Sequence, residues 1–174
     1  AMPEAKQVLD LFSGTSRVGY ALKKSGYRVL SNDHNKYAYT LARCYVETDL
    51  EEVESSAQKL IAEFNKVIGS PGYFTENFCL KSRFFHPKNG ERVDAIREII
   101  VQKNLPPALE AVILVSLMEA ADRVDSTCGI QMAYLKNWAK RSEKDLLLKM
   151  PLLLSAKEQG SCKAFRLDAL KAAQ

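Results

Sequence analysis

The chain has 174 residues, of which 47% are hydrophobic and 26% charged, and it carries a net charge of +4 at pH 7. This composition is typical of one globular domain with an elaboration, and it excludes disordered, collagen-like and fibrous proteins. No apolar run approaches the roughly 18 residues of a membrane span, and no apolar leader follows Met2. We therefore expect a cytoplasmic protein with no membrane partner.

The N-terminal part of the chain predicts a strand, a helix and a second strand. Residues 7–12 form a short apolar run that breaks before Gly14, which is typical of a buried parallel strand. A helix is expected to follow and to end at Gly26, after which residues 27–31 predict a strand that leads into Asp33. These elements make a βαβ unit, the start of a doubly wound α/β sheet.

The pattern then turns helical for about a hundred residues, which is too long for a simple crossover between two strands. The expected elements are helices at residues 37–46, 51–67, 93–101, 109–124 and 132–139, a turn at 69–72, an aromatic and basic loop at 73–90, and strands at 146–150 and 163–167. A final helix is expected to begin at Asp168. We therefore expect an α/β part in residues 1–48 and 144–174 and an all-helical insertion in residues 49–143.

The junction between the first strand and its helix predicts a nucleoside site. Residues 10–19 read DLFSGTSRVG, and Asp33 ends the next strand 19 residues after Gly14. Glycine lets a ligand approach the backbone, and an acidic residue at the end of strand two can accept hydrogen bonds from both ribose hydroxyls. A turn that merely packs the helix on the sheet is the alternative interpretation.

The type of cofactor depends on charge. A dinucleotide favours GxGxxG, but Ser16 replaces the second glycine here, and Asp10 lies four residues before Gly14. A carboxylate at that place would repel a pyrophosphate, whereas it suits the sulfonium and amino groups of S-adenosylmethionine. We therefore favour S-adenosylmethionine over a nicotinamide cofactor. We expect no metal, since the sequence has neither a CxxC pair nor an HExxH motif.

These residues resemble the adenine-specific DNA methyltransferases that carry a DPPY-type catalytic motif. Residues 10–19 are similar to their cofactor motif, residues 27–39 to the strand with the ribose-binding acid, and residues 166–170 to the third cofactor strand. Residues 82–100 and 116–138 are similar to the helical part of one bacterial branch.

The resemblance implies a Rossmann-like methyltransferase fold with the helical insertion between strands two and three. It also implies a set of cofactor-binding residues, which are Asp10, Phe12, Gly14, Thr15, Ser16, Asp33 and Asp168. The function implied is transfer of a methyl group from S-adenosylmethionine to the exocyclic amino group of adenine in DNA.

The family's catalytic motif is missing from the sequence. It consists of an Asp, Asn or Ser, two prolines and an aromatic residue, which hold the amino group and stack on the flipped base. The chain's only Pro-Pro pair stands between Leu105 and Ala108 and provides neither group. We therefore expect a truncated fold without catalytic residues, inactive alone, with a companion chain supplying the motif. The alternatives are a non-catalytic cofactor- or DNA-binding module and one part of a split methyltransferase.

Two surfaces are expected to bind partners. Basic residues interleaved with Phe84 and Phe85 could contact the phosphates and bases of double-stranded DNA, and the candidates are Lys81, Arg83, Lys88, Arg92 and Lys136. A solvated charged face is the alternative. A sheet of about three strands also leaves an unpaired apolar edge, which favours a homo-oligomer through that edge.

Overall fold

The computed structural model describes residues 5–129, 135–155 and 161–174. The chain divides into two compact units, the first made of Ala1–Ala57, Pro107–Val115 and Pro151–Gln174, the second of Gln58–Pro106 and Ser116–Met150. None of the helices in the described ranges combines the length and apolar character that crossing a bilayer requires. The functional division expected at residues 49 and 143 stays a prediction.

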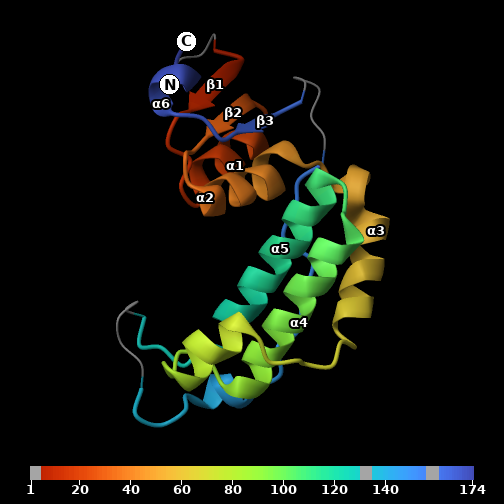
Figure 1. The fold of residues 1–174 in the computed structure, drawn as a ribbon. Coiled ribbons are helices and arrows are strands. Elements are labelled where there is room, and N and C mark those ends of the chain that lie inside the picture. Colours follow the sequence, from red (N-terminus) through yellow and green to blue (C-terminus); the bar gives the residue numbers. More distant parts are fainter. Residues whose placement is uncertain (1–4, 130–134, 156–160) are drawn as a thin grey trace. The chain divides into compact units, whose positions relative to one another are not determined.

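The first unit contains a parallel sheet. Its strands β1 (Gln7–Asp10), β2 (Arg28–Asn32) and β3 (Lys163–Phe165) lie side by side in the order β1-β2-β3 (Figure 1). Helix α1 (Arg17–Lys24) joins β1 to β2, so the expected βαβ unit is confirmed. The strand expected at residues 163–167 is confirmed as β3, which makes the chain a mixed α/β protein.

Helix α1 ends as the sequence predicts, because Gly26 follows it with φ +92°. The Gly26 N–H donates to the Lys23 carbonyl at 2.9 Å, and the Tyr27 N–H donates to the Leu22 carbonyl at 3.1 Å. These two bonds form a Schellman motif, which satisfies carbonyls that the last turn leaves free. The chain is thereby turned directly into β2.

The other helices of the first unit follow the sheet. They are α2 (Lys36–Ala42), the π-helix η1 (Arg43–Glu47), the beginnings of α3 (Leu50–Phe64) and α5 (Pro107–Asp122), and α6 (Ala169–Ala172), which starts after Asp168 as expected. Lys23 of α1 is only 2% exposed, and its ammonium contacts the Asp49 carboxylate at 2.7 Å and the Thr48 carbonyl at 2.8 Å. This ion pair fixes α1 against the segment that enters α3.

The second unit is helical. It contains the π-helix η2 (Thr75–Leu80), α4 (Pro87–Lys103), the end of α5 (Pro107–Asp122) and the short 3-10 helix η3 (Lys140–Glu143). The expected break between α4 and α5 at the Pro-Pro pair is confirmed. Arg92 of α4 donates to the carbonyls of Phe64 and Asn65 at the end of α3, which ties these helices together.

The loop expected at residues 73–90 is wrong in part, because it contains η2 and the first turn of α4. The Asp94 carboxylate stabilises the beginning of η2. It accepts hydrogen bonds of 2.7 to 2.9 Å from the N–H groups of residues 72, 74 and 75 and from the Thr75 hydroxyl. An acid 19 residues away therefore caps this helix, which local sequence does not reveal. Pro87 stands at the first position of α4, where a missing N–H costs nothing.

The strand expected at residues 146–150 is also wrong. This segment belongs to no ladder among the described residues, and the side chains of Asn65 and Asn89 bond to its peptide groups. The Asn89 oxygen accepts from the Leu146 N–H at 3.0 Å, and the Asn65 amide bonds both the N–H and the carbonyl of Leu148. Leu146 and Leu148 are buried while Leu147 is exposed, so the alternating pattern reflects packing on helices rather than in a sheet.

The helix expected at residues 132–139 falls partly outside the described residues. Its described part, residues 135–139, is not helical. The Leu135 N–H donates to the Ser126 carbonyl at 3.3 Å, and the Ala139 N–H donates to the Ser126 hydroxyl at 3.1 Å. Bonds to a distant serine thus replace the local bonds that a helix would make.

Candidate functional site

The loop after β1 forms a tight bend at the carboxyl end of the sheet. The Ser13 N–H donates to the Asn32 carbonyl at 2.9 Å, and the Ser16 N–H donates to the Ser13 carbonyl at 2.7 Å. Gly14 and Ser16 both have positive φ, at +50° and +60°. A Cβ added at Gly14 would have no neighbour closer than 4.0 Å, so a ligand can approach the backbone there.

Asp33 lies against this bend. One of its carboxylate oxygens accepts the Gly14 N–H and the other accepts the Asn35 N–H, each at 2.9 Å. An ionised carboxylate offers about four acceptor positions, so these bonds fix its orientation and leave capacity for ligand hydroxyls. Gly14 and Asp33 were predicted to line one nucleoside site, and the structure brings them into direct contact.

Asp10, at the end of β1, adds a second carboxyl group. Burial raises the pKa of Asp10, the nearby Asp33 carboxylate raises it further, and the Gly19 amide opposes both effects. The Asp10 Oδ2 atom is buried and has no hydrogen-bond partner among the described residues. A positive charge bound beside this pair would relieve the repulsion between Asp10 and Asp33.

Asn32 is a positioning residue that the sequence analysis did not single out. It is 1% exposed, and its amide nitrogen donates to the carbonyls of Leu11 and Leu167, both at 3.2 Å, while its oxygen accepts the Leu167 N–H at 3.0 Å. Asn32 therefore holds the loops after β1 and β3 together. A buried polar residue ending an apolar strand was the available signal. Asp168 follows this loop, where it is exposed and caps α6 through the Leu170 N–H.

The remaining cofactor candidates lie on the bend itself. The Phe12 side chain is 75% exposed, which is unusual for a large apolar group and provides a flat surface beside Gly14. Thr15 is exposed, whereas Ser16 is fully buried and its hydroxyl has no partner among the described residues. The site thus combines hydrogen-bond acceptors for hydroxyl groups, an exposed aromatic ring and an excess of negative charge. This combination fits a nucleoside that carries a positive charge.

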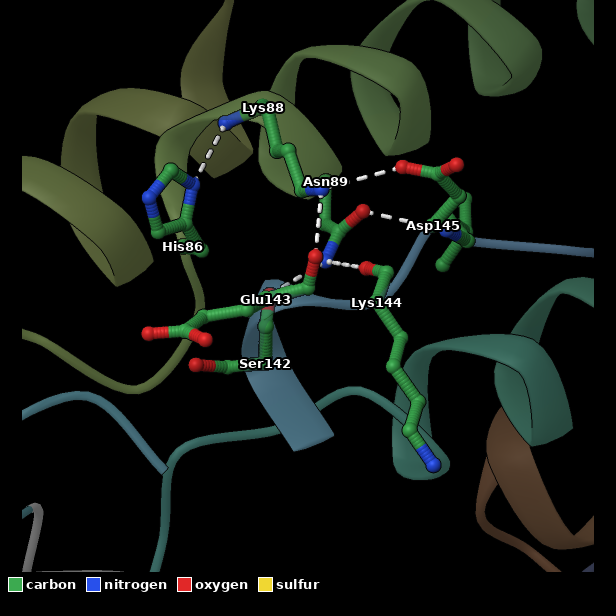
Figure 2. Close-up of polar contacts among 8 residues, drawn as sticks. His86, Lys88, Asn89, Ser142, Glu143, Lys144 and Asp145 are labelled. Atoms are coloured by element: carbon green, nitrogen blue, oxygen red, sulfur yellow. Dashed lines mark hydrogen bonds and ion pairs between the residues drawn. The ribbon is translucent and has the colours of Figure 1, made fainter. Parts of the chain in front are cut away.

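The expected DNA contacts lie in the second unit, where four of the five side chains donate to groups of the protein. The Lys81 ammonium contacts the Glu76 carboxylate at 2.6 Å, and Arg92 donates to the end of α3. The Lys88 ammonium contacts the Glu143 carbonyl at 2.5 Å and the Asp145 carboxylate at 3.0 Å (Figure 2). Each of these side chains therefore already has a bonding partner within the protein.

Arg83 and Lys136, the remaining two of the five candidates, contact each other. The Arg83 Nη1 atom donates to the Lys136 carbonyl at 2.7 Å, and the guanidinium lies over the Trp138 ring, 4.5 Å from its centre. Lys136 is exposed, and so is Lys140 nearby in sequence. The sequence analysis did not anticipate Trp138, because its contact depends on a loop 55 residues earlier in the chain.

Known proteins of one family are similar to the chain. The sequence profile of the D12 class N6 adenine-specific DNA methyltransferases matches residues 1–173. Type II methyltransferase M.NlaIII of Neisseria lactamica is 32% identical over 155 residues, which cover 84% of this chain and 46% of that protein. Type II methyltransferase M.FokI of Planomicrobium okeanokoites is 30% identical, with 84% of this chain and 25% of that protein covered.

Modification methylase StsI of Streptococcus sanguinis is 30% identical over 181 residues, with 92% of this chain and 26% of that protein covered. The chain thus spans between a quarter and a half of the length of these relatives. No solved structure is significantly similar to it. Because the family profile covers nearly every residue, the resemblance noted in the sequence is confirmed, and the chain belongs to the D12 class N6 adenine-specific DNA methyltransferases.

Proposed function

We propose that the chain binds S-adenosylmethionine at the carboxyl ends of β1, β2 and β3. The observation that carries this proposal is the carboxylate pair Asp10 and Asp33 beside the open backbone of Gly14. Asp33 would accept hydrogen bonds from the ribose hydroxyls, and Asp10 would face the positively charged amino acid part. When bound, the cofactor supplies an electrophilic methyl group.

Four further residues would complete this site. Phe12 would cover an apolar surface of the ligand, and Thr15 and the backbone of Ser16 would line the bend. Asp168, which follows β3, would accept a hydrogen bond from the cofactor's adenine amino group. Its Oδ1 atom already accepts the Leu170 N–H, and the second carboxylate oxygen provides that acceptor.

The reaction we propose is methyl transfer to the exocyclic amino group of adenine in double-stranded DNA. The printed sequence contains no acceptor followed by two prolines and an aromatic residue, and its Pro106-Pro107 pair starts helix α5. A further polypeptide segment, in the same or a companion chain, would therefore supply the groups that hold the base. Action on cellular DNA is also the basis for proposing a cytoplasmic location.

DNA recognition is proposed for the helical insertion, residues 49–143. The candidate contacts are five basic residues of this insertion, namely Lys81, Arg83, Lys88, Arg92 and Lys136. Their positive charge suits a phosphate backbone, which provides most of the sequence-independent affinity of DNA-binding proteins.

A labelled-methyl assay tests this function. The chain is incubated with duplex DNA and methyl-labelled S-adenosylmethionine, with and without a segment of the Neisseria lactamica relative from outside the matched residues. After digestion to nucleosides, we expect label in N6-methyladenine only when that segment is present. Transfer by the chain alone would show that the base-holding groups lie within these 174 residues. Label in cytosine, or none with the segment present, would contradict the proposed reaction.

A further inference from the structure

A segment of the second unit, residues 135–142, which we call the arm and which ends in the first residues of η3, is held in place from both ends. Ser126 fixes its beginning by bonding to the N–H groups of Leu135 and Ala139. Arg141 fixes its end, since its guanidinium donates to the carbonyls of Asp125 and Thr127 at 3.0 and 2.9 Å. The arm therefore presents its exposed side chains in one arrangement.

Asn89 adds a third attachment just beyond the arm. Its amide nitrogen donates to the carbonyls of Ser142 and Lys144, both at 2.9 Å, and its oxygen accepts the Leu146 N–H (Figure 2). Asn89 is only 1% exposed, so its bonds are shielded from water. Ligand-binding loops held in this way lose little conformational entropy on binding.

The arm and the loop before α4 form a surface that carries three cationic residues without a carboxylate at ion-pair distance among the described residues. They are Arg83, Lys136 and Lys140. By contrast, Lys81, Lys88 and Arg141 of the same region each pair with an acidic side chain. Arg83 bonds to the Lys136 backbone, so two cationic residues are kept together without a neutralising partner. A polyanion would gain electrostatic energy at this place.

Trp138 orients the guanidinium of Arg83. The Arg83 Cζ atom lies 4.5 Å from the Trp138 ring centre, and the His86 ring centre lies 5.0 Å from it. Stacking and the bond to the Lys136 carbonyl fix the plane of the guanidinium while using one of its five donors. A planar fork with free donors binds phosphate oxygens in pairs, which an ammonium group cannot do.

We propose that Arg83, Lys136 and Lys140 bind neighbouring phosphates of duplex DNA and that Trp138 positions Arg83 for this contact. The proposal rests on the proposed DNA-modifying function and deepens it. It adds Lys140 as a phosphate contact and Trp138 as a positioning residue, and it removes Lys81, Lys88 and Arg92 from the candidate contacts, because their side chains already bond within the protein.

Salt-dependent binding to a labelled duplex tests the proposal. Affinity is measured by fluorescence anisotropy at several salt concentrations for the 174-residue chain and for Lys136→Ala, Lys140→Ala and Arg83→Ala. Each variant is expected to weaken binding and to reduce the slope of log K against log salt by about 0.9, the value for one phosphate contact. The matched control is Lys59→Ala, which removes an exposed lysine of α3 in the same unit that has no carboxylate at ion-pair distance among the described residues.

The role of Trp138 has its own readout. Trp138→Ala is expected to weaken DNA binding in the wild-type background and to have no further effect in Arg83→Ala, whereas Trp138→Phe retains most of the affinity. Equal losses in both backgrounds would show that Trp138 acts independently of Arg83. Melting temperatures of all variants identify any loss caused by unfolding.

The remaining outcomes separate this surface from the proposed function. If the wild-type chain binds duplex DNA and the three variants bind equally well, the surface is wrong while the function stands. If the wild-type chain binds no DNA at low salt, the proposed DNA substrate fails as well. If duplex RNA binds as tightly as duplex DNA, and each variant weakens RNA binding as much as DNA binding, the assignment to DNA is overturned.

Discussion

Ser16 occupies a backbone conformation that side chains avoid. Its φ is +60°, at the residue that caps the beginning of α1, and it is fully buried. A residue with a Cβ pays about 1 kcal/mol or more in this left-handed region, whereas glycine does not. The second glycine of a GxGxxG motif would stand at this position, so the structure gives a physical reason for that preference.

Two substitutions at Ser16 separate this strain from the loss of the hydroxyl. Both Ser16→Gly and Ser16→Ala remove the buried oxygen, but only alanine keeps a Cβ in the left-handed region. We expect Ser16→Gly to be more stable than Ser16→Ala by about 1 kcal/mol, as measured by urea unfolding. Equal unfolding free energies of the two variants would mean that the left-handed backbone at residue 16 does not destabilise a residue with a Cβ.

At the scale of single residues, the sequence identified the residues that lie at the carboxyl ends of β1 and β2. Gly14 and Asp33 were predicted to line one nucleoside site, and the Gly14 N–H donates to the Asp33 carboxylate. The polar residue at the end of an apolar strand was a signal for Asn32, but its partners were not predictable, since Leu11 and Leu167 lie on two different loops. Which polar residue can bridge two such loops depends on the order of the strands in the sheet. The sequence alone does not reveal that order.

Elements with local signals were predicted, and elements that depend on distant side chains were not. Apolar runs and a capping glycine were sufficient for β1, α1, β2 and β3. Residues 146–150 carry the same alternating pattern, yet Asn65 and Asn89 bind this segment to helices instead of a sheet. Period-two alternation identifies an extended segment with one buried face and does not identify what covers that face.

The π-helix η2 should be sensitive to acid because of Asp94. Burial alone would raise the pKa of Asp94, but hydrogen bonds from Thr75, Phe74 and Gly72 outweigh it and lower that pKa below the usual 3.8. The native state therefore binds this proton less readily than the unfolded state does. The stability from Asp94 is fully present above pH 4 to 5 and is lost as the pH falls through the lowered pKa.

Asp94→Asn tests this account. Asparagine has one acceptor oxygen instead of two, so we expect the variant to lose about 1 to 3 kcal/mol of unfolding free energy at pH 7. The difference from wild type should shrink as the pH is lowered from 5 to 3, when denaturant unfolding is measured at each pH. A difference that stays constant over this range would mean that the Asp94 charge does not stabilise η2.

At the scale of the whole molecule, the sheet has an open edge. Within the described residues β1 pairs with β2 alone, and its Leu9 side chain is 42% exposed. An unpaired strand with apolar side chains favours pairing with another strand. We therefore expect the chain to self-associate through β1, with sedimentation velocity showing dimers or larger species that grow with concentration.

A charge on this strand should reduce the association. Leu9→Lys is expected to shift the sedimentation profile towards monomer, whereas Leu152→Lys, which alters a more exposed leucine of the same unit, should not. A wild-type chain that remains monomeric at all concentrations would contradict the expected edge pairing.

The central claim is that Asp10, Gly14 and Asp33 form a site for a positively charged nucleoside, and calorimetric titration with S-adenosylmethionine tests it most directly. The wild-type chain is compared with Asp33→Ala and with Asp122→Ala, which removes an exposed acid of the second unit and changes the net charge equally. We predict saturable binding that Asp33→Ala weakens by roughly 1 to 3 kcal/mol, about 5- to 150-fold, and that Asp122→Ala leaves unchanged. Absence of binding heat in the folded wild-type chain, or equal affinity of Asp33→Ala, would contradict the claim.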